Sequence, residues 1–407
     1  MAAPLPNTQQ AMRQRNLSLV LHTLAAEGPL SRAAVAARIG VTRAGVSALV
    51  EELLRLDLIT ELGPGRPGTV GRPGSALALN ENGPCGIGAE VGVDHLSVCA
   101  VDLRGKVVAR IAVDAANRGR APEPLLAELG RLVTAVAAEA ESTGLRPAGL
   151  TVAVPGLVAR GTDTVVRAPN LGWKGVEIPA LLDPALTARL PVTVDNEANL
   201  GALAELWLAP TPVASDFIHV SAEIGIGAAL VVDGALLRGA HGFAGELGHV
   251  PVRPEGPDCG CGGRGCLEQY AGEEAVLRAS GLAPEEEAGR HPGPGARIAL
   301  LAERAAAGDA RVRTALEEAG TALGIALAGA VNMLDPGAVV LGGALAGLAP
   351  WMLPALEAEL GGRVADPART VRTEVSAIGA DGPLLGAAHS VVHTVLDAPA
   401  SYASPLE

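Results

Sequence analysis

The chain is poor in aromatic residues and in cysteine, and it lacks a long apolar run. Aromatic residues make up only 2% of its 407 residues while hydrophobic residues make up 49%, so leucine, valine and alanine must fill the core. No apolar stretch reaches the roughly 18 residues that a membrane span needs, so we expect no role for a membrane. Residues 1–7 contain no basic region followed by an apolar stretch, so we expect no secretory signal. The length indicates two or three domains.

Cysteine is scarce, and its five positions are unevenly spread. Cys85 and Cys99 are isolated in apolar surroundings and are expected in the core. The other three lie in one glycine-rich loop, residues 259–266. Few cysteines, clustered as metal ligands, are typical of a reducing compartment, so we expect a cytoplasmic protein.

The glycine-rich loop carries the donor set of a metal site. Cys259, Cys261 and Cys266 supply three thiolates, and His249 supplies an imidazole just upstream. Three thiolates and one imidazole make a closed tetrahedral set for zinc. The glycines let the backbone turn tightly enough for Cys259 and Cys261 to face one ion. The sequence therefore predicts a structural Zn²⁺ site with these four ligands, against the alternative of a loop that merely contains cysteines.

Basic residues are outnumbered, and the net charge of −13 by itself speaks against binding to nucleic acid. The charge is uneven, however. Residues 1–80 carry eight arginines and five acids, a balance of +3, which leaves −16 for the rest of the chain. A basic head on an acidic body is typical of a DNA-binding module attached to a ligand-binding domain.

The head shows the pattern of a helix-turn-helix. Apolar residues recur at helical spacing over residues 17–24. Ser31 is a good N-cap for a second helix and Thr42 for a third. In this motif the later helix enters the major groove with its N-terminal residues on base edges. The residues that we expect to contact DNA here are Ser31, Arg32, Thr42, Arg43 and Ser47.

A wing is predicted after the third helix. Two Gly-Arg-Pro-Gly elements place Arg66 and Arg72 on an extended tip, followed by a strand over residues 76–79. Arginines on such a tip suit a narrow minor groove or contacts with phosphates. We therefore assign residues 1–82 to a winged helix-turn-helix that binds DNA, against the alternative of a small helical domain with a solvated linker.

The rest of the chain alternates strands and helices, which indicates an α/β fold with covered sheets. Residues 86–94 and 96–102 form a predicted hairpin, and further buried strands are expected near residues 150–156 and 191–195. Residues 281–297 are rich in proline, glycine and glutamate and are expected to form a surface insertion. A helix over residues 384–395 is expected to pack back on the first lobe.

Several motifs in this body resemble those of one family. They are residues 234–249 with the cysteine loop and Glu268, together with residues 155–156, 168–173, 195–199, 332–336 and 341–343. Together they are similar to the signature of the ROK family, which comprises bacterial sugar kinases and sugar-responsive repressors. The resemblance covers residues 84–395, and the winged head matches the repressor branch, with the stretch after Glu90 most similar to xylose-repressor-type members.

The resemblance implies an actin-like fold of two lobes behind the winged head. The first lobe would span residues 83–200 and include the C-terminal helix 380–397, and the second lobe would span residues 201–379. The sugar contacts that the resemblance implies fall on Asn170, Asn196, Glu197, Glu246, His249 and Glu268. Carboxylates and amides can hydrogen-bond neighbouring sugar hydroxyls in pairs, which a purely apolar pocket cannot do.

The two loops that hold phosphate in the family's kinases are altered in this chain. The first, similar to Asp-x-Gly-Gly-Thr-Lys in the kinases, is residues 90–95, where Asp94 adds negative charge. The second, Gly-Thr-Gly in the kinases, is Glu223, Ile224 and Gly225. Isoleucine has no hydroxyl, and Glu223 would repel phosphate. The position of the kinase base holds Glu197, which could still accept a proton. We therefore expect no enzyme activity.

The sequence thus predicts a transcriptional repressor that binds operator DNA and an unphosphorylated sugar. The alternatives are a sugar kinase with an appended DNA-binding head and a repressor controlled by another protein. Xylose, glucose and an N-acetylhexosamine remain open as effectors, as does the direction of the sugar's effect on DNA binding. We expect a homodimer or homotetramer, and the operator sequence is left open.

Overall fold

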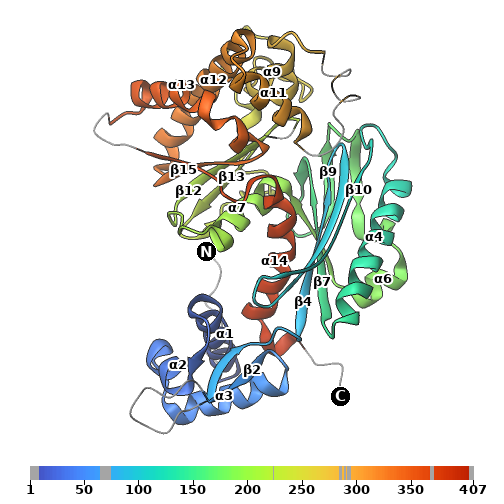
Figure 1. Cartoon of the computed structure of the whole chain (residues 1–407), viewed down its shortest axis with the longest axis vertical. Helices are drawn as coiled ribbons and strands as arrows, with labels where there is room; N and C mark the ends of the chain where they lie inside the picture. Colours follow the sequence, from blue (N-terminus) through green and yellow to red (C-terminus); the bar gives the residue numbers. More distant parts are fainter. Residues whose placement is uncertain are drawn as a thin grey trace.

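The computed structural model describes residues 9–64, 75–222, 224–283, 287, 290, 295–366 and 371–402. These residues form a head and two lobes, each lobe built on a five-stranded sheet. We call the lobe with strands β4–β7 and β11 the first lobe and the lobe with strands β12–β16 the second. In Figure 1 the second lobe lies at the top, the first lobe at the right and the head below them.

The head consists of three helices and a small antiparallel sheet in which β3 pairs with both other strands. In chain order its elements are α1 (Gln9–Glu27), β1 (Leu30–Ser31), α2 (Arg32–Ile39), α3 (Arg43–Arg55), β2 (Ile59–Pro64) and β3 (Ser75–Leu79). The axes of α2 and α3 are bent by 111°, within the roughly 90–120° of paired helices in helix-turn-helix motifs. The predicted wing residues Arg66 and Arg72 lie outside the described residues.

The caps that the sequence predicts in the head are confirmed. The Ser31 hydroxyl accepts a hydrogen bond from the backbone N–H of Ala34, and the Thr42 hydroxyl accepts one from Gly45, both at 3.2 Å. Such bonds satisfy N–H groups that the first turn of a helix leaves without a partner. The predicted stripes are also buried, as seen for Leu21 in α1 and Val50 in α3.

The first lobe is a mixed sheet with the strand order β11-β7-β4-β5-β6. Its strands are β4 (Pro84–Val91), β5 (His95–Asp102), β6 (Val107–Asp114), β7 (Arg146–Val154) and β11 (Val192–Asn196). Strands β4, β5 and β6 run antiparallel, which confirms the predicted hairpin, whereas β7 and β11 run parallel to β4. Helix α4 (Pro122–Ser142) and helix α14 (Gly382–Asp397) cover opposite faces of this sheet (Figure 1).

A second, three-stranded sheet extends the first lobe, with the order β10-β9-β8. It contains β8 (Leu157–Val158), β9 (Thr164–Ala168) and β10 (Trp173–Glu177), and it is followed by the short helices α5 (Ile178–Leu181) and α6 (Pro184–Arg189). This small sheet matters for function because the turn after β9 carries Asn170, one of the predicted sugar contacts.

The second lobe is a mixed sheet with the order β14-β13-β12-β15-β16. Its strands are β12 (Phe217–Ala222), β13 (Ile226–Val232), β14 (Ala235–Leu236), β15 (Ala338–Gly343) and β16 (Arg372–Val375). Helix α7 (Glu197–Leu208) packs on one face, and the long helix α12 (Ala310–Leu334) with α13 (Ala349–Arg363) packs on the other. The smaller elements are η1 (Leu247–His249), α8 (Glu268–Ala271), α9 (Glu273–Ala279), α11 (Ala296–Ala306), η2 (Ala344–Leu348), η3 (Gly379–Asp381) and η4 (Pro399–Ser401).

Leucine, valine and alanine fill both lobe cores, as the shortage of aromatic residues predicts. The two isolated cysteines, Cys85 and Cys99, are buried as expected. Burial raises the pKa of each thiol to about 12, so both remain neutral and act as small apolar groups.

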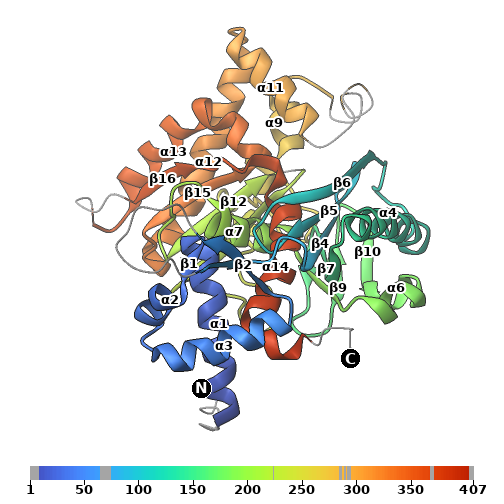
Figure 2. The same ribbon diagram turned by 60° about the horizontal axis from the view of Figure 1, so that its bottom comes forward.

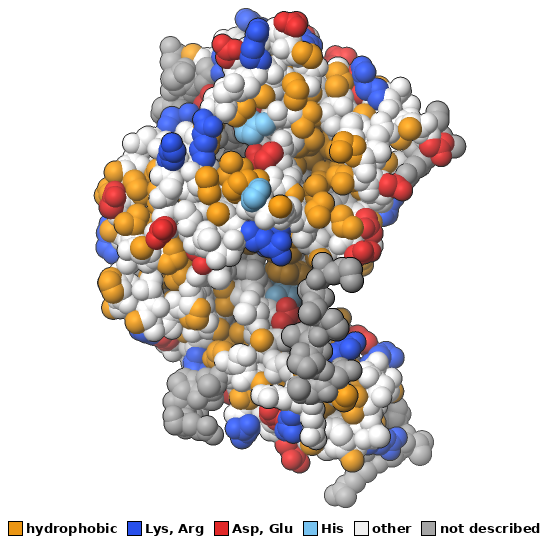
Figure 3. Space-filling view, turned by 180° about the vertical axis from the view of Figure 1, so that it is seen from behind, with side chains coloured by type: hydrophobic (Ala, Val, Ile, Leu, Met, Phe, Trp, Pro, Cys, Tyr) orange, Lys and Arg blue, Asp and Glu red, His pale blue; other side chains and the backbone are white. Residues whose placement is uncertain are grey.

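The head is joined to the body by a shared apolar core. Leu21 and Leu24 of α1 belong to the same buried cluster as Val392 and Leu396 of α14 and Val101 of β5. Figure 2 shows α1 and α14 side by side, and Figure 3 shows that the outline of the molecule narrows between the lobes and the head. The predicted helix over residues 384–395 is confirmed, and it contacts the head as well as the first lobe.

One sequence-based expectation fails at the C-terminal end of its range, while most of the middle of that range lies outside the described residues. Residues 281–297 were expected to form a surface insertion, but the described end of this stretch begins α11, and Arg297 is only 6% exposed. The reason is that two carboxylates, Asp94 and Glu273, pair with its guanidinium group. Among the described residues no single helix has the length and apolar character of a membrane span, and only the bent pair α2 and α3 meets that test jointly.

Candidate functional site

The four predicted metal ligands lie together in the second lobe. Their donor atoms, one each from His249, Cys259, Cys261 and Cys266, all lie within 4.8 Å of one another. The Sγ atoms of Cys261 and Cys266 are 3.7 Å apart. Zinc–sulfur bonds of about 2.3 Å in a tetrahedron require about 3.8 Å between two sulfurs. The residues present therefore fit a tetrahedral ion.

The backbone of the loop depends on a glycine at its tightest turn. Gly265 has a φ of +64°, and a Cβ atom there would lie 1.7 Å from the carbonyl oxygen of Arg253. Only glycine fits both conditions. Arg167 of β9 binds the loop from the first lobe, because its guanidinium donates to the carbonyl oxygens of Gly260 and Cys261 at 2.9 and 3.2 Å.

His249 connects the metal cluster to a cavity. Its Nδ1 lies 3.8 Å from Sγ of Cys259, and its Nε2 lies 3.7 Å from a carboxylate oxygen of Glu246. One ring nitrogen thus faces the metal ligands while the other faces a carboxylate at the cavity. A metal bound through Nδ1 would fix the orientation of Nε2.

The cavity has a volume of about 110 Å³ and lies between the two lobes. All six residues for which the sequence predicts a sugar contact line it: Asn170, Asn196, Glu197, Glu246, His249 and Glu268. Asn170 and Asn196 come from the first lobe, Glu197 begins helix α7 where the two lobes meet, and the other three come from the second lobe. The structure brings these residues together, and their contact with a sugar stays a prediction.

Asn196 is held in place by the start of α7. Its side-chain oxygen accepts hydrogen bonds from the backbone N–H groups of Ala198 and Asn199 at 2.8 and 3.3 Å, which makes it the N-cap of the helix. Its amide nitrogen donates to the carbonyl oxygen of Gly156 at 2.8 Å. An amide nitrogen carries two hydrogens, so one remains for a ligand.

Glu268 and Asn170 approach each other over Gly225. A Cβ atom at residue 225 would lie 2.2 Å from Oε2 of Glu268 and 3.7 Å from Nδ2 of Asn170. The glycine therefore leaves room for a carboxylate of the second lobe beside an amide of the first. This pair can accept and donate hydrogen bonds at adjacent points, as recognition of neighbouring hydroxyls requires.

The surroundings of the three cavity carboxyl groups raise their pKa values. Burial and the negative charge of Glu90 raise the pKa of Glu197 to about 7, although His95 opposes the shift. Partial burial raises the pKa of Glu246 and of Glu268 as well. A carboxyl group that keeps its proton near neutral pH can donate a hydrogen bond as well as accept one.

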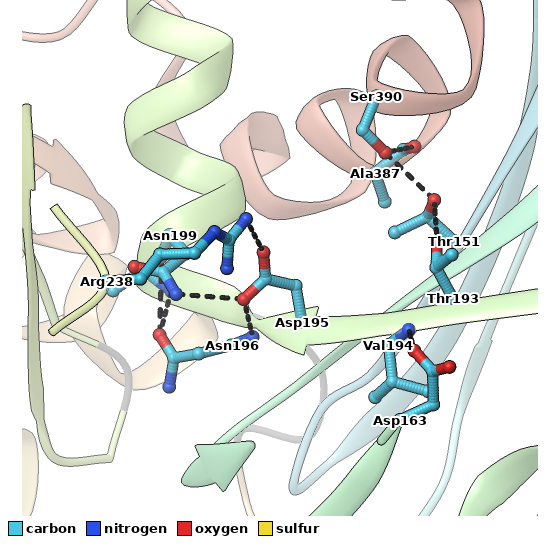
Figure 4. A network of polar contacts seen from close by, with 11 residues as sticks. Thr151, Asp163, Thr193, Val194, Asp195, Asn196, Asn199, Arg238, Ala387 and Ser390 are labelled. Carbon is cyan, nitrogen blue, oxygen red and sulfur yellow. Dashed lines mark hydrogen bonds and ion pairs between the residues drawn. The ribbon is translucent and has the colours of Figure 1, made fainter. Parts of the chain in front are cut away.

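A polar network that sequence reasoning missed lies behind Asn196 (Figure 4). Asp195 accepts hydrogen bonds from the backbone N–H of Asn196 and from the side chain of Asn199, both at 2.8 Å. Its other oxygen is 2.6 Å from Nη2 of Arg238, which follows β14 of the second lobe. The sequence did contain one signal for these two residues, because Asp195 and Arg238 lie inside two of the motifs that carry the predicted sugar contacts.

Ionisable side chains lie close together in the turn for which the sequence predicts the first altered phosphate loop. In the turn between β4 and β5, Nδ1 of His95 is 3.1 Å from Oδ1 of Asp94, and Nε2 is 3.6 Å from a carboxylate oxygen of Glu90. In the second loop Ile224 lines the cavity, while Glu223 lies outside the described residues. These groups bring acidic side chains to the turn for which the sequence predicts an altered phosphate loop, and the loss of phosphate binding stays a prediction.

The described DNA-contact candidates fall into two groups. The hydroxyls of Ser31 and Thr42 are engaged as helix caps, and the Ser47 hydroxyl donates to the carbonyl oxygen of Arg43 at 3.0 Å. Arg32 forms an ion pair with Glu61. The side chain of Arg43 is exposed in the first turn of α3 and can reach a partner outside the protein.

Comparison with known proteins gives a consistent result. The model of the ROK family matches residues 86–394. The xylose repressor of Caldicellulosiruptor bescii is 32% identical over 81% of this chain and 83% of its own length. The xylose repressor of Bacillus spizizenii is 28% identical over 96% of this chain and 98% of its own.

A solved structure has a similar fold over nearly the whole chain. A ROK family transcriptional regulator, described as a homolog of the Escherichia coli MLC protein, superposes with a TM-score of 0.76. It is 24% identical and covers 95% of this chain and 98% of its own. The match of the family model over most of the chain, together with these relatives, shows that the protein belongs to the ROK family.

Proposed function

We propose that the protein is a sugar-responsive transcriptional repressor without kinase activity. The observation that carries this proposal is the pairing of a polar cavity between the lobes with a helix-turn-helix head on a shared core. Residues 1–82 are assigned to a winged helix-turn-helix, residues 83–200 with 380–397 to the first lobe, and residues 201–379 to the second. Relatives named repressors that match nearly the whole chain support the assignment.

Operator DNA is proposed to bind the head. Residues at the start of α3 enter the major groove, and Arg43 is the exposed cation there. Arg66 and Arg72, with the other predicted contacts Ser31, Arg32, Thr42 and Ser47, complete the proposed surface. Two half-sites require two heads, so we propose a homodimer or a homotetramer in solution.

The effector is proposed to be an unphosphorylated sugar bound in the cavity between the lobes. The amides of Asn170 and Asn196 and the carboxyl groups of Glu197, Glu246 and Glu268 provide donors and acceptors on several sides. The names of the relatives make xylose the first sugar to test. Glucose and an N-acetylhexosamine complete the panel.

Zinc is proposed as the structural ion of the cysteine loop, held by His249, Cys259, Cys261 and Cys266. When bound it supplies a fixed tetrahedral anchor. The chain's own groups link this anchor to the cavity. His249 presents Nε2 toward Glu246, and Cys266 holds the loop two residues before Glu268.

Transfer of phosphate is disfavoured by the loops that would have to bind ATP. Phosphate needs backbone N–H groups and cations, whereas Asp94 and Glu90 bring negative charge to this side of the cavity. The absence of a hydroxyl at Ile224 points the same way. A kinase with an appended head is therefore the runner-up.

The test is calorimetric titration of the zinc-loaded protein with the three sugars and with ATP, followed by gel-shift titration of operator DNA. We expect one sugar to bind, ATP not to bind, and saturating sugar to change operator affinity, because binding at two coupled sites is reciprocal. ATP binding with release of ADP would replace the repressor by the kinase. Operator affinity that does not respond to any sugar would favour control by a protein partner.

A further inference from the structure

An arginine between two carboxylates joins the lobes at the end of the cleft far from the head. Nη2 of Arg297 lies 3.2 Å from Oδ2 of Asp94, and its Nε donates to Oε1 of Glu273. Asp94 belongs to the first lobe, in the turn between β4 and β5. Arg297 and Glu273 belong to α11 and α9 of the second, which Figure 1 shows farthest from the head.

Neither water nor the dipole of its own helix stabilises the positive charge of Arg297. The side chain of Arg297 is only 7% exposed, and that of Glu273 only 3%. Arg297 also lies in the first turn of α11, where the helix dipole disfavours a positive charge. A buried charge is costly unless it is paired. The position of Arg297 is therefore explained by the two carboxylates, one of which is in the other lobe.

In the first lobe, hydrogen bonds hold Asp94 and its turn in place. The side chain of Asn117, which is fully buried, donates to the carbonyl oxygens of Gly92 and His95 at 2.8 and 3.0 Å and so clamps the turn on both sides of Asp94. Oδ1 of Asp94 is also 3.1 Å from Nδ1 of His95. Oδ2 is thereby left to point across the cleft.

In the second lobe, Glu273 lies close in the chain to Glu268, which lines the cavity. Glu273 is the first residue of α9, and a single residue, Gly272, separates it from α8, which begins at Glu268. On the first-lobe side, Val93 precedes Asp94 and lines the same cavity. The spacing of Asp94 and Glu273 through Arg297 thus sets the spacing of two cavity walls, Val93 and Glu268.

We infer that Asp94, Arg297 and Glu273 form a latch that holds the two lobes at the spacing seen in this structure, on either side of the proposed effector cavity. A ligand that binds only this latched arrangement has an apparent affinity that is scaled by the fraction of molecules in that arrangement. Weakening the latch therefore weakens binding without removing any contact to the ligand. The neighbouring pair of Arg118 and Glu274 also crosses the cleft, but its side chains are 53% and 36% exposed, so it adds little.

Asp94→Asn is the informative variant, because it removes the charge across the cleft and leaves the pair of Arg297 and Glu273 intact. We expect the sugar-free variant to have a larger radius of gyration by small-angle X-ray scattering than the wild type. We expect its affinity for the sugar found by calorimetry to fall about tenfold, with saturating sugar restoring the compact form. Asp94→Glu keeps the carboxylate and is expected to lose less than threefold.

Arg304→Gln is the matched control, since Arg304 lies on the same helix and pairs with Asp309 inside the second lobe. This variant should leave both the radius of gyration and the sugar affinity unchanged. Wild-type scattering and wild-type sugar affinity in Asp94→Asn would overturn the latch. The sugar affinity rests on the proposed function, but scattering of the sugar-free proteins does not. If no sugar binds the wild type, the proposed function fails, while the scattering comparison still decides the latch.

Discussion

Glu197 and Asp94 are both carboxylates beside the cleft, yet their surroundings shift their pKa values in opposite directions. Burial and the charge of Glu90 raise the pKa of Glu197. Burial alone would also raise the pKa of Asp94, but the hydrogen bond from His95 and the charge of Arg297 lower it. Asp94 therefore stays ionised in its ion pair, whereas Glu197 changes its charge near neutral pH. The local partner, and not the residue type, decides the role of each carboxyl group.

The raised pKa of Glu197 predicts a pH-dependent stability. A carboxyl group with a pKa of about 7 when folded, against 4.5 in the ordinary state, favours the folded protein below about pH 4.5. This contribution is lost as the pH rises through 7. Relative to the wild type, Glu197→Gln should therefore become more stable as the pH rises from 5 to 8. We expect its free energy of unfolding to gain on the order of 1–2 kcal/mol over this range, because water in the cavity screens the charge. Urea unfolding at several pH values measures the difference.

The control for this comparison is Glu139→Gln on the exposed face of α4. It removes a carboxylate from a solvent-exposed position and so controls for the loss of the charge itself. Contributions from the buried histidines cancel, because both proteins contain them. A difference between Glu197→Gln and wild type that stays flat from pH 5 to pH 8 would show that Glu197 is ionised throughout.

At the scale of elements, the parts that local chemistry dictates could be predicted. The caps Ser31 and Thr42 depend only on the residues next to them, and the cysteine loop depends on a few glycines and its own donors. The six cavity residues were identified from motifs of the family, and the structure brings them together. What could not be predicted are contacts between elements far apart in the chain. Arg297 was placed in a surface insertion because its partner Asp94 is about two hundred residues away.

The metal loop is an element whose shape should depend on its ion. Cys261→Ser removes one of four ligands, so we expect the purified protein to lose zinc and the loop to lose its fixed turn. His249 and Glu268 would then be free to move, and sugar affinity should fall at least tenfold. Metal content by mass spectrometry and sugar affinity by calorimetry are the two measurements.

Cys99→Ala provides the comparison for this variant, because Cys99 is a buried core residue outside the loop. It should keep one zinc per chain and bind sugar like the wild type, with a modest loss of stability. If Cys261→Ser loses its metal but keeps the wild-type response to sugar, the loop does not support the effector site.

At the scale of the whole molecule, α14 is the element that the head and the lobes share. Its residues pack on α1 of the head, on the first-lobe sheet and on α7. Helix α7 begins at Asn196 and Glu197 in the cavity. A change in the cavity that moves α7 can therefore reach the head through packed side chains, which do not deform continuously. The exposed face of α3 lies outside this route and should affect only DNA binding.

Arg43→Ala tests this separation of recognition from coupling. We expect operator affinity to fall about 10- to 100-fold, the range for loss of one arginine contact to DNA, while sugar affinity without DNA stays unchanged. The ratio of operator affinities with and without saturating sugar should also stay the same, because the coupling does not pass through Arg43. Arg131→Ala on α4 removes the same charge from an exposed surface away from the head and should leave operator affinity at the wild-type value. An equal loss of sugar and operator binding in Arg43→Ala would mean that the head does not act as a separate DNA-binding module.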